Sequence, residues 1–378
     1  MNSESTRRQM MKTLGAALVG CGLSSRGQAQ VTATGESAKR ATEVMNYIHE
    51  NFWMKKRDLY KTAIDKDSPD FIWGSGVMFS AVVAAARHDK NYKSIMRKFF
   101  DGMEVYWDSK VKIPGYEPAP TGGNGNDKYY DDNAWMVIMF LEAYEMTDES
   151  RYLKRANEVL DFVMSGWDEE AGGGIWWHQN HDGGSKNTCV NGPAAVGCFR
   201  ISKFSDAKAA PKRVADGGKI VKWTTANLRA SNGLFGDSLN VATGKKNNDQ
   251  LTYNAAMMLR AYINLYALTG EDLYLEEAKV TGKAANGLLE SATGAYRDPW
   301  KWAHLMVEAD YELYRWTQEE YLFKRFKTNC DVNYEKWKQS PPKDLIENAS
   351  LARQLWLMVD HDTAIGRDFW KKSDKLWK

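Results

Sequence analysis

Segments that are apolar on every side alternate along this chain with segments that are apolar on one face only. Residues 71–88 and 134–146 are mostly apolar over several helical turns, whereas residues 92–107 and 152–164 carry charged side chains on one face. The first pattern is typical of a helix buried on all sides, and the second is typical of a helix at the surface. The alternation therefore predicts pairs that each contain one buried and one amphipathic helix.

The predicted helix pairs recur about every 60 residues, with further pairs over residues 188–228 and 252–289 and a looser fit over residues 303–362. Residues 144–153 (YEMTDESRYL) resemble residues 266–275 (YALTGEDLYL), two periods later. A fixed period of this length is typical of repeated supersecondary units. A glycine and an aromatic residue follow each of three amphipathic segments, at Gly174 with Trp176, Gly233 with Phe235, and Gly294 with Tyr296.

Two architectures suit repeated helix pairs, an open solenoid and a closed ring. A solenoid needs polar caps at both ends, whereas a ring places the all-apolar helices inside and the amphipathic helices outside. The buried segments favour a ring, and no alternating apolar pattern of useful length indicates a substantial sheet. We therefore predict an all-α fold, an (α/α)6 barrel of six helix pairs in a single domain over residues 31–378. Its active site is expected in the funnel where loops enter the inner helices.

The first thirty residues resemble an export signal. Arg7 and Arg8 precede a mildly apolar run that is too short for an ordinary transmembrane helix, and STRRQMMK resembles a twin-arginine signal. LVGC, which ends at Cys21, resembles a lipoprotein box, and a competing cleavage site follows residues 27–29. We expect export to the periplasm, the cell surface or the medium, with a lipid anchor and free secretion both open. No other stretch is apolar enough to span a membrane.

Charge and composition exclude some partners. The chain has 51 basic and 49 acidic residues and a net charge of +2, without a basic stripe, so nucleic acid is not a predicted partner. Its 15 tryptophans could stack on the apolar faces of sugar rings or fill a large core. We expect a monomer.

The cysteines and histidines predict neither a disulfide framework nor a metal site. If Cys21 belongs to the signal, three cysteines remain, and Cys189 and Cys198 would lie roughly 13 Å apart in one helix, beyond disulfide reach. His178 and His181 have a spacing that a metal could use. They lie in a glycine-rich segment without an acidic or cysteine partner at helical spacing, so no metal is expected.

The most distinctive stretch is residues 121–146, TGGNGNDKYYDDNAWMVIMFLEAYEM. Its glycines lack a Cβ, so the loop can bend sharply and lie close over a ligand. The loop leads into Asp131 and Asp132 at the start of a buried helix. Two carboxylates in that place are costly unless they are paired or used, although capping of the helix is an alternative role.

A pair of carboxyl groups suits glycosidic bond cleavage. One group protonates the leaving oxygen, and the other attacks the anomeric carbon or activates water; a separation of about 5–5.5 Å favours retention. Neighbouring residues such as Asp131 and Asp132 could reach that separation. Their closeness would also separate their pKa values, because two like charges at short range resist joint ionisation.

These residues resemble a known family. TGGNGNDKYYDDNAWM, followed by Asn191-Gly192-Pro193 and Thr252-Tyr253-Asn254, is similar to glycoside hydrolase family 76, and the resemblance covers most of the chain after the signal. It implies an (α/α)6 endo-α-1,6-mannanase that acts on α-mannan polysaccharide or oligosaccharide. It also implies retention, with Asp131 as nucleophile and Asp132 as general acid/base, and no metal or organic cofactor.

One segment departs from the family's pattern. Where fungal members carry a Lys-Gly-containing motif, this chain has HLMVEADYELYRW at residues 304–316. The departure leaves the distal part of the substrate cleft, and with it the specificity, open.

Other residues near the mouths of the buried helices are candidates for substrate contact. Asparagine both donates and accepts hydrogen bonds, as sugar hydroxyls require, although it also caps helices. Tryptophan stacks on sugars but also packs in cores. The predicted substrate-binding residues are Asn133, Trp73, Trp176, Trp177, Asn191, Asp249, Tyr253 and Asn254. Asp249 could instead belong to a solvated loop.

Two other functions remain open at this point. The first is another (α/α)6 carbohydrate enzyme, such as an unsaturated glucuronyl hydrolase, a lyase or an epimerase. Lyases and epimerases would call for a His or Tyr base, whereas an Asp pair fills the prominent position here. The second is a non-catalytic glycan-binding lipoprotein that kept the cleft and lost turnover.

Overall fold

The computed structural model describes residues 34–181 and 184–377. The chain divides into two compact units, Met1–Val31 and Thr32–Lys378. The first unit lies outside the described residues, so the export signal and the lipoprotein box predicted for residues 1–30 stay predictions. All elements below belong to the second unit, and none of its described helices is long and apolar enough to cross a bilayer.

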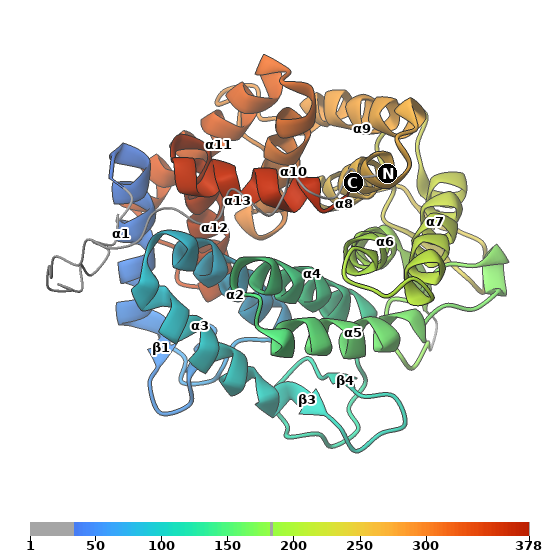
Figure 1. Cartoon of the computed structure of the whole chain (residues 1–378), viewed down its shortest axis with the longest axis horizontal. Helices are drawn as coiled ribbons and strands as arrows, with labels where there is room; N and C mark the ends of the chain where they lie inside the picture. Colours follow the sequence, from blue (N-terminus) through green and yellow to red (C-terminus); the bar gives the residue numbers. More distant parts are fainter. Residues whose placement is uncertain (1–33, 182–183, 378) are drawn as a thin grey trace, which may run out of the picture. The chain divides into compact units, whose positions relative to one another are not determined.

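Six inner helices form a closed ring within this unit (Figure 1). Each contacts the next along the chain, and the last contacts the first. Most residues in them are buried, which explains why their sequences lack a polar face. They are α2 (Ile72–His88), α4 (Tyr130–Thr147), α6 (Thr188–Ser202), α8 (Thr252–Thr269), α10 (Trp300–Thr317) and α12 (Leu345–Asp362).

Six outer helices surround the ring. Five of them pack on the inner helix that precedes them, whereas α1 packs on α12 and so joins the start of the unit to its end. This arrangement confirms the predicted all-α (α/α)6 barrel. The outer helices are α1 (Glu36–Phe52), α3 (Lys90–Gly102), α5 (Ser150–Met164), α7 (Ala209–Leu228), α9 (Asp272–Ala284) and α11 (Glu320–Gln339).

The repeated sequence at residues 144–153 and 266–275 spans the end of an inner helix and the start of the outer helix that follows it. Asp148 follows α4 with a φ of 60°, and Gly270 follows α8 with a φ of 70°, so each ends its helix in the left-handed conformation. The threonine before each, Thr147 or Thr269, bonds back to the helix and accepts a hydrogen bond from the backbone N–H two residues on. Gln318 ends α10 in the same way with a φ of 58°.

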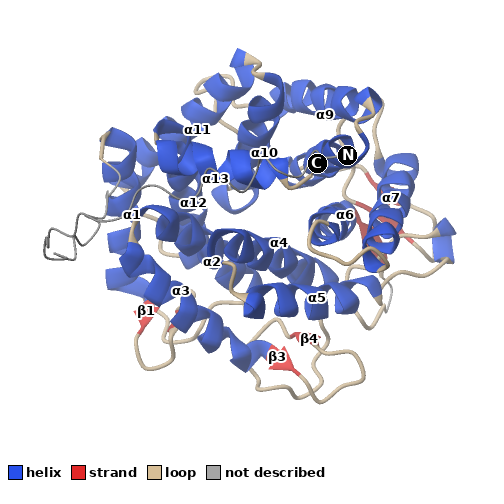
Figure 2. Cartoon of the chain, in the orientation of Figure 1, coloured by secondary structure: helices blue, strands red, loops and turns tan. Residues whose placement is uncertain are grey.

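The strands are short and lie in the loops between helices (Figure 2). Within the described residues the longest has three residues and all pairings are antiparallel, in agreement with the absence of a predicted sheet. In the only three-stranded sheet of that part, Lys186 pairs with Leu239, and Leu239 pairs with Lys246. The strands are β1 (Trp53–Met54), β2 (Leu59–Tyr60), β3 (Trp107–Asp108), β4 (Gly115–Tyr116), β5 (Ser185–Asn187), β6 (Ser238–Asn240) and β7 (Lys246–Asn247).

The inner helices also carry a buried network of ion pairs, which their apolar pattern does not predict. Arg353 donates to Glu142 at 2.7 and 2.8 Å and to Glu308 at 2.9 and 3.1 Å. Glu142 also accepts from Arg87 at 2.6 Å, and Arg260 lies 3.1 Å from Glu308. These charges are tolerated inside the barrel because each has an oppositely charged partner.

A further helix, α13 (Ala364–Lys375), follows the last inner helix and is not predicted by the sequence pattern. It contacts α12 and α2. Its Trp370 donates from Nε1 to Asp360 near the end of α12, at 2.9 Å. The helix therefore packs at the C-terminal ends of the inner helices.

Candidate active site

A cavity of about 800 Å³ lies at the N-terminal ends of five inner helices, from α2 to α10. Its volume falls within the 300–1,000 Å³ that is usual for small-molecule sites. Trp73, Asp131, Cys189 and Tyr253 all line it, and each is the second residue of its helix, in α2, α4, α6 and α8 respectively. The internal repeat thus brings one position of successive helix pairs to a common hollow.

Asp131 is held by several hydrogen-bond donors. The indole Nε1 of Trp177 donates to its Oδ2 at 2.9 Å, and the thiol of Cys189 lies 3.6 Å from the same oxygen. The backbone N–H of Asp132 donates to Oδ1 at 2.8 Å. Burial raises the pKa of Asp131 to about 6, while these donors favour its charged form.

Asp132 has a different environment. Within the described part of the chain, no group donates a hydrogen bond to its side chain. Burial raises its pKa well above the usual range, and the charge of Asp131 raises it further. The pair can therefore share one proton, which Asp132 holds while Asp131 is ionised.

A chain of hydrogen bonds fixes the wall beside the two aspartates. Trp135 donates from Nε1 to the hydroxyl of Tyr253, which donates at 2.9 Å to the carbonyl oxygen of Cys189. Burial raises the pKa of both the Tyr253 hydroxyl and the Cys189 thiol, so both groups stay neutral donors at neutral pH.

Aromatic side chains form much of the rest of the wall. Trp73, Trp177 and Trp302 line the cavity, and Trp177 is 39% exposed. Tyr129 packs edge-on against Trp177 with ring centroids 5.2 Å apart. Such faces suit the apolar faces of sugar rings.

A polar patch lies on the side of the sheet, and the sequence analysis missed three of its four residues. Asp237 and Ser238 line the cavity with Asn187 of β5 and with Asn254 of α8. Burial raises the pKa of Asp237, although Ser238 and Asn254 favour its charged form. The Asn254 amide is fully buried beside Asp237, and in the described chain neither of its polar atoms has a partner of normal hydrogen-bond geometry.

The repeat could have revealed two of the missed residues. Cys189 holds the same helix position as Asp131. Trp177 and Asp237 each lie two residues beyond a bridge residue, Ile175 or Phe235, in successive repeats. Aligning the repeats by helix start would have identified Cys189, whereas Asp237 matches Trp177 only when the repeats are aligned by their bridge residues.

Asn133 and Asn191, predicted to contact substrate, do not line the cavity that contains Asp131 and Asp132. Both are fully buried and bind backbone groups. Asn133 accepts from the N–H of Tyr116 at 2.8 Å and donates to its carbonyl at 3.0 Å. Asn191 does the same with Ile175, at 2.9 and 3.1 Å. Their recurrence reflects a structural tie between each inner helix and the preceding hairpin or loop.

Trp176 and Asp249 also lie away from the cavity lining. Trp176 is 5% exposed, donates from Nε1 to Asp168 at 2.6 Å and stacks on His181 with centroids 4.4 Å apart. Asp249 is exposed, as expected of the alternative solvated loop. Of the predicted site residues, the cavity therefore brings together Asp131, Asp132, Trp73, Trp177, Tyr253 and Asn254.

The glycine-rich loop ahead of the pair does not line the cavity either. The backbone N–H groups of Asn124 and Asn126 donate to Oε1 of the buried Glu117 at 3.2 and 2.9 Å. Gly123 has a φ of 76° and lies against Asp108, where a Cβ would be 3.0 Å from Oδ1. Gly123 thus allows a close approach of the loop to Asp108, whereas a Cβ at Gly122 or Gly125 would meet open space.

The divergent segment 304–316 belongs to α10 and contributes nothing to this cavity. His304 is buried, which lowers its pKa to about 4, and Glu308 belongs to the ion-pair network. The doubt that this segment raised about the distal cleft is therefore not supported by its position.

The histidines considered for metal binding have other neighbours. Nδ1 of His178 lies 2.7 Å from Asp127, and His181 stacks on Trp176. Within residues 34–181 and 184–377, no group of three or more His, Cys, Asp or Glu side chains could hold a metal ion. Cys189, Cys198 and Cys330 are free thiols.

Solved structures share this fold. A family 76 α-mannanase from Bacteroides thetaiotaomicron matches with a TM-score of 0.79 at 22% identity, over 86% of this chain and 95% of that one. A family 76 α-1,6-mannanase from Salegentibacter sp. HEL1_6 matches at 0.72 and 19% identity, over 85% and 98%. An inactive variant of that enzyme, with two consecutive aspartates replaced by alanine, was solved with α-1,6-mannotetrose; it matches at 0.72 and 18%, over 85% and 98%.

Among curated proteins no relative matches the chain. The family model for glycosyl hydrolase family 76, however, matches residues 36–337, which is most of the barrel. The chain therefore belongs to glycosyl hydrolase family 76.

Proposed function

We propose that this chain is a retaining endo-glycosidase that hydrolyses α-1,6-mannosidic linkages in α-mannan backbones. The observation that carries the proposal is the unlike environment of two adjacent carboxyls in one cavity. Asp131 accepts hydrogen bonds from Trp177 and from the backbone of Asp132, whereas no donor in the described chain bonds to the Asp132 side chain, and the charge of Asp131 raises its pKa. An ionised group beside a protonated one is what displacement at an anomeric carbon needs.

In this proposal Asp131 attacks the anomeric carbon and Asp132 protonates the leaving oxygen. The glycosyl group is then bonded to Asp131, and Asp132, now ionised, takes a proton from the water that hydrolyses this ester. Two consecutive residues can bring their carboxyls within the short range of about 5–5.5 Å that is typical of retention. Two displacements at one carbon restore the original anomeric configuration.

The substrate class rests on the cavity and on the relatives. The tryptophan faces and the polar patch around Asp237 and Asn254 suit a neutral sugar chain, which presents apolar ring faces and hydroxyl edges. The Salegentibacter relative is named an α-1,6-mannanase, and its inactive variant lacks two consecutive aspartates. We infer the same linkage and the same roles here.

The test is a panel of linear and branched glycans assayed for new reducing ends. Wild type should release them from linear α-1,6-mannan, and Asp131→Asn or Asp132→Asn should each lower the rate by about a thousandfold or more. Asp249→Asn is the matched control, because this aspartate is exposed and lies outside the cavity lining. Wild-type rates in both cavity variants would overturn the assignment. Binding of mannan without hydrolysis by wild type would favour the non-catalytic glycan-binding protein.

We also propose that the chain acts outside the cytoplasm, because Arg7 and Arg8 precede a short apolar run. Fractionation of cells that express the full chain tests this. Replacement of both arginines by lysine should hold the protein in the cytoplasm. Cys21→Ser should release it from the membrane fraction if the lipid anchor is used, and should change nothing if the chain is freely secreted.

A further inference from the structure

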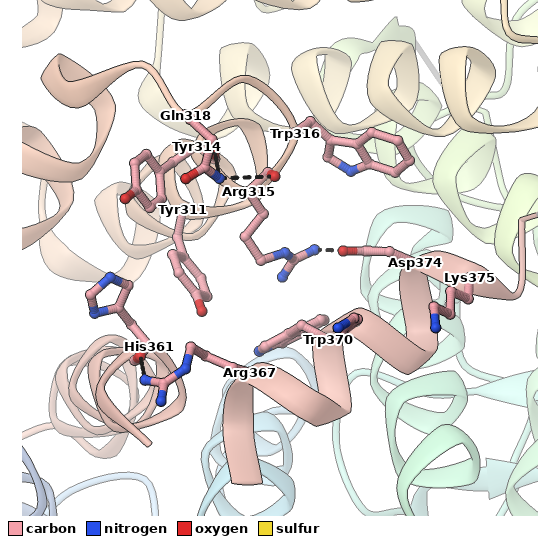
Figure 3. A pocket seen from close by; sticks show the side chains of 11 residues that line it. Tyr311, Tyr314, Arg315, Trp316, Gln318, His361, Arg367, Trp370, Asp374 and Lys375 are labelled. Carbon is pink, nitrogen blue, oxygen red and sulfur yellow. Dashed lines mark hydrogen bonds and ion pairs between the residues drawn. The ribbon is translucent and has the colours of Figure 1, made fainter. Parts of the chain in front are cut away.

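A second cavity, of about 440 Å³, lies at the opposite ends of the inner helices (Figure 3). The C-terminal ends of α10 and α12 form one side, and α13 forms the other. The divergent segment 304–316 supplies part of its wall, and α13 lies beyond residue 337, where the family match ends. The residues of this chain that match the family model therefore form only part of the lining of this cavity.

Cations predominate in the lining. Arg367, Lys371 and Lys375 follow each other at intervals of four residues and so lie along one face of α13, and Arg315 faces them from α10. Asp374 is the only carboxylate that lines the cavity. Within the described residues neither lysine has an ion-pair partner. Like charges at this helical spacing repel each other, so an anion in the cavity would relieve the repulsion.

Arg315 is the central cation of the site. Its side chain is 13% exposed, and its guanidinium donates to Asp374 at 3.2 Å. The guanidinium stacks over Trp370 at 4.2 Å and lies 5.4 Å from the ring of Tyr311. Figure 3 shows it between these two rings. Its Nε is buried without a partner in the described chain, which leaves part of its hydrogen-bonding capacity unused.

The remaining lining suits a sugar more than a bare anion. Tyr314 and Trp316 present aromatic surface at the cavity, whereas the ring of Tyr311, which also lines it, is covered by Phe326 and Arg315. In the described chain neither tyrosine hydroxyl has a hydrogen-bond partner, so both can bind the hydroxyls of a ligand. A lone phosphate would leave most of this surface and volume unused.

We propose that this cavity is a second binding site, for a phosphorylated saccharide. Arg315, Lys371 and Lys375 bind the phosphate, and the aromatic side chains contact the sugar ring. The site lies at the other end of the barrel from Asp131 and Asp132 and does not depend on the proposed hydrolysis.

Calorimetric titration of the full chain with mannose 6-phosphate tests the proposal, with mannose and inorganic phosphate as matched ligands. We expect one site with a Kd in about the millimolar range or below, weaker binding at higher salt, and at least about tenfold weaker binding of both matched ligands. The double variant Lys371→Gln/Lys375→Gln should weaken binding of the sugar phosphate about tenfold or more. Both lysines are exposed, so this variant should fold.

Two control variants complete the test. Lys372→Gln changes an exposed cation of α13 that does not line the cavity, and it should bind like wild type. The Asp131→Asn/Asp132→Asn variant should also bind like wild type, which separates this site from the first cavity. No detectable binding, or equal binding in the double lysine variant, would overturn the proposal. Inorganic phosphate or a nucleoside monophosphate that binds as tightly as mannose 6-phosphate would overturn the assignment to a saccharide.

Discussion

Trp177 donates a hydrogen bond from its indole Nε1 to Oδ2 of Asp131, at 2.9 Å. The same tryptophan accepts, through its carbonyl oxygen, a hydrogen bond of 2.9 Å from the backbone N–H of Tyr130 at the start of α4. Two hydrogen bonds thus connect this loop residue to the N-terminal end of the helix that carries both aspartates. Because the indole lowers the pKa of Asp131 while burial raises it, this contact helps to set which carboxyl stays ionised.

Trp177→Phe should test that contact. The substitution keeps an aromatic face and removes the donor, so the pKa of Asp131 should rise and its ionised fraction near neutrality should fall. We expect kcat/KM to drop about tenfold at pH 6 and less at higher pH, with the acidic limb displaced upward. Trp73→Phe, at the same cavity but without a bond to Asp131, is the matched control. An unchanged acidic limb in Trp177→Phe would show that the indole does not act on Asp131.

The rate should depend on pH through both aspartates. Asp131 must be ionised to attack, and burial places its pKa at about 6, so kcat/KM should rise as the pH passes through that value. Asp132 must be protonated, and its pKa lies well above the usual range, so the rate should fall again at higher pH. A profile of kcat/KM from about pH 4 into the alkaline range would show the rise through the pKa of Asp131 and the later fall as Asp132 loses its proton. A rate that does not rise as the pH passes through about 6, or that increases steadily toward acid, would contradict these roles.

A comparison of substrates with different leaving groups should show whether Asp132 is the general acid. Asp132→Ala removes the proposed proton donor, and its rate on mannan should fall by about 10²–10⁴-fold. An aryl mannoside with an acidic phenol needs no such proton, so its glycosylation step should be affected far less. Added azide should then accelerate turnover and yield a glycosyl azide with the configuration of the substrate. If Asp132→Ala slows both substrates equally, Asp132 is not the acid.

Asp70 should make the barrel less stable at neutral pH. It is 5% exposed, and burial raises its pKa from 3.8 to about 6. The folded state therefore binds this proton more tightly than the unfolded state, and stability falls as the pH rises from about 4 through about 6. Asp70→Asn removes this loss and keeps an acceptor for the N–H of Phe71, which now donates at 2.9 Å.

Denaturant unfolding would measure the effect of Asp70→Asn. The variant should have a higher free energy of unfolding at pH 7, by up to about 3 kcal/mol, and nearly the wild-type value at pH 4. The exposed Asp249→Asn should stay within about 0.5 kcal/mol of wild type at both pH values. A gain that does not depend on pH would contradict the explanation by proton binding.

The fold could be predicted from the sequence, because the repeat of the helix pairs and the burial of each helix are visible directly in its pattern of apolar and polar positions. The sequence was also sufficient to place Asp131 and Asp132 at a cavity, since both begin a buried helix. The direction in which each side chain points could not be predicted from the sequence in this way. Asn133 lies next to Asp132 in sequence, but one further step around the helix turns its amide toward the backbone of Tyr116.

Contacts between segments that are distant in the sequence could not be predicted either. The pairing of Arg353 with Glu142 joins residues 211 positions apart, and neither residue alone predicts a buried charge. Asp237 reaches the cavity because the three-stranded sheet carries it there, and strands this short leave no alternating pattern. The last helix, α13, is amphipathic, but only its contacts with α10 and α12 show that it forms the wall of a second cavity.

The most direct test of the central claim is the configuration of the first product. Proton NMR of linear α-1,6-mannan oligosaccharides, recorded before mutarotation, distinguishes the new anomers. Two displacements, the first by Asp131 with Asp132 as acid, predict that the α-anomer of the reducing end forms first and the β-anomer grows in slowly. A β-anomer that forms first would mean a single displacement by water, and it would contradict the role of Asp131 as nucleophile.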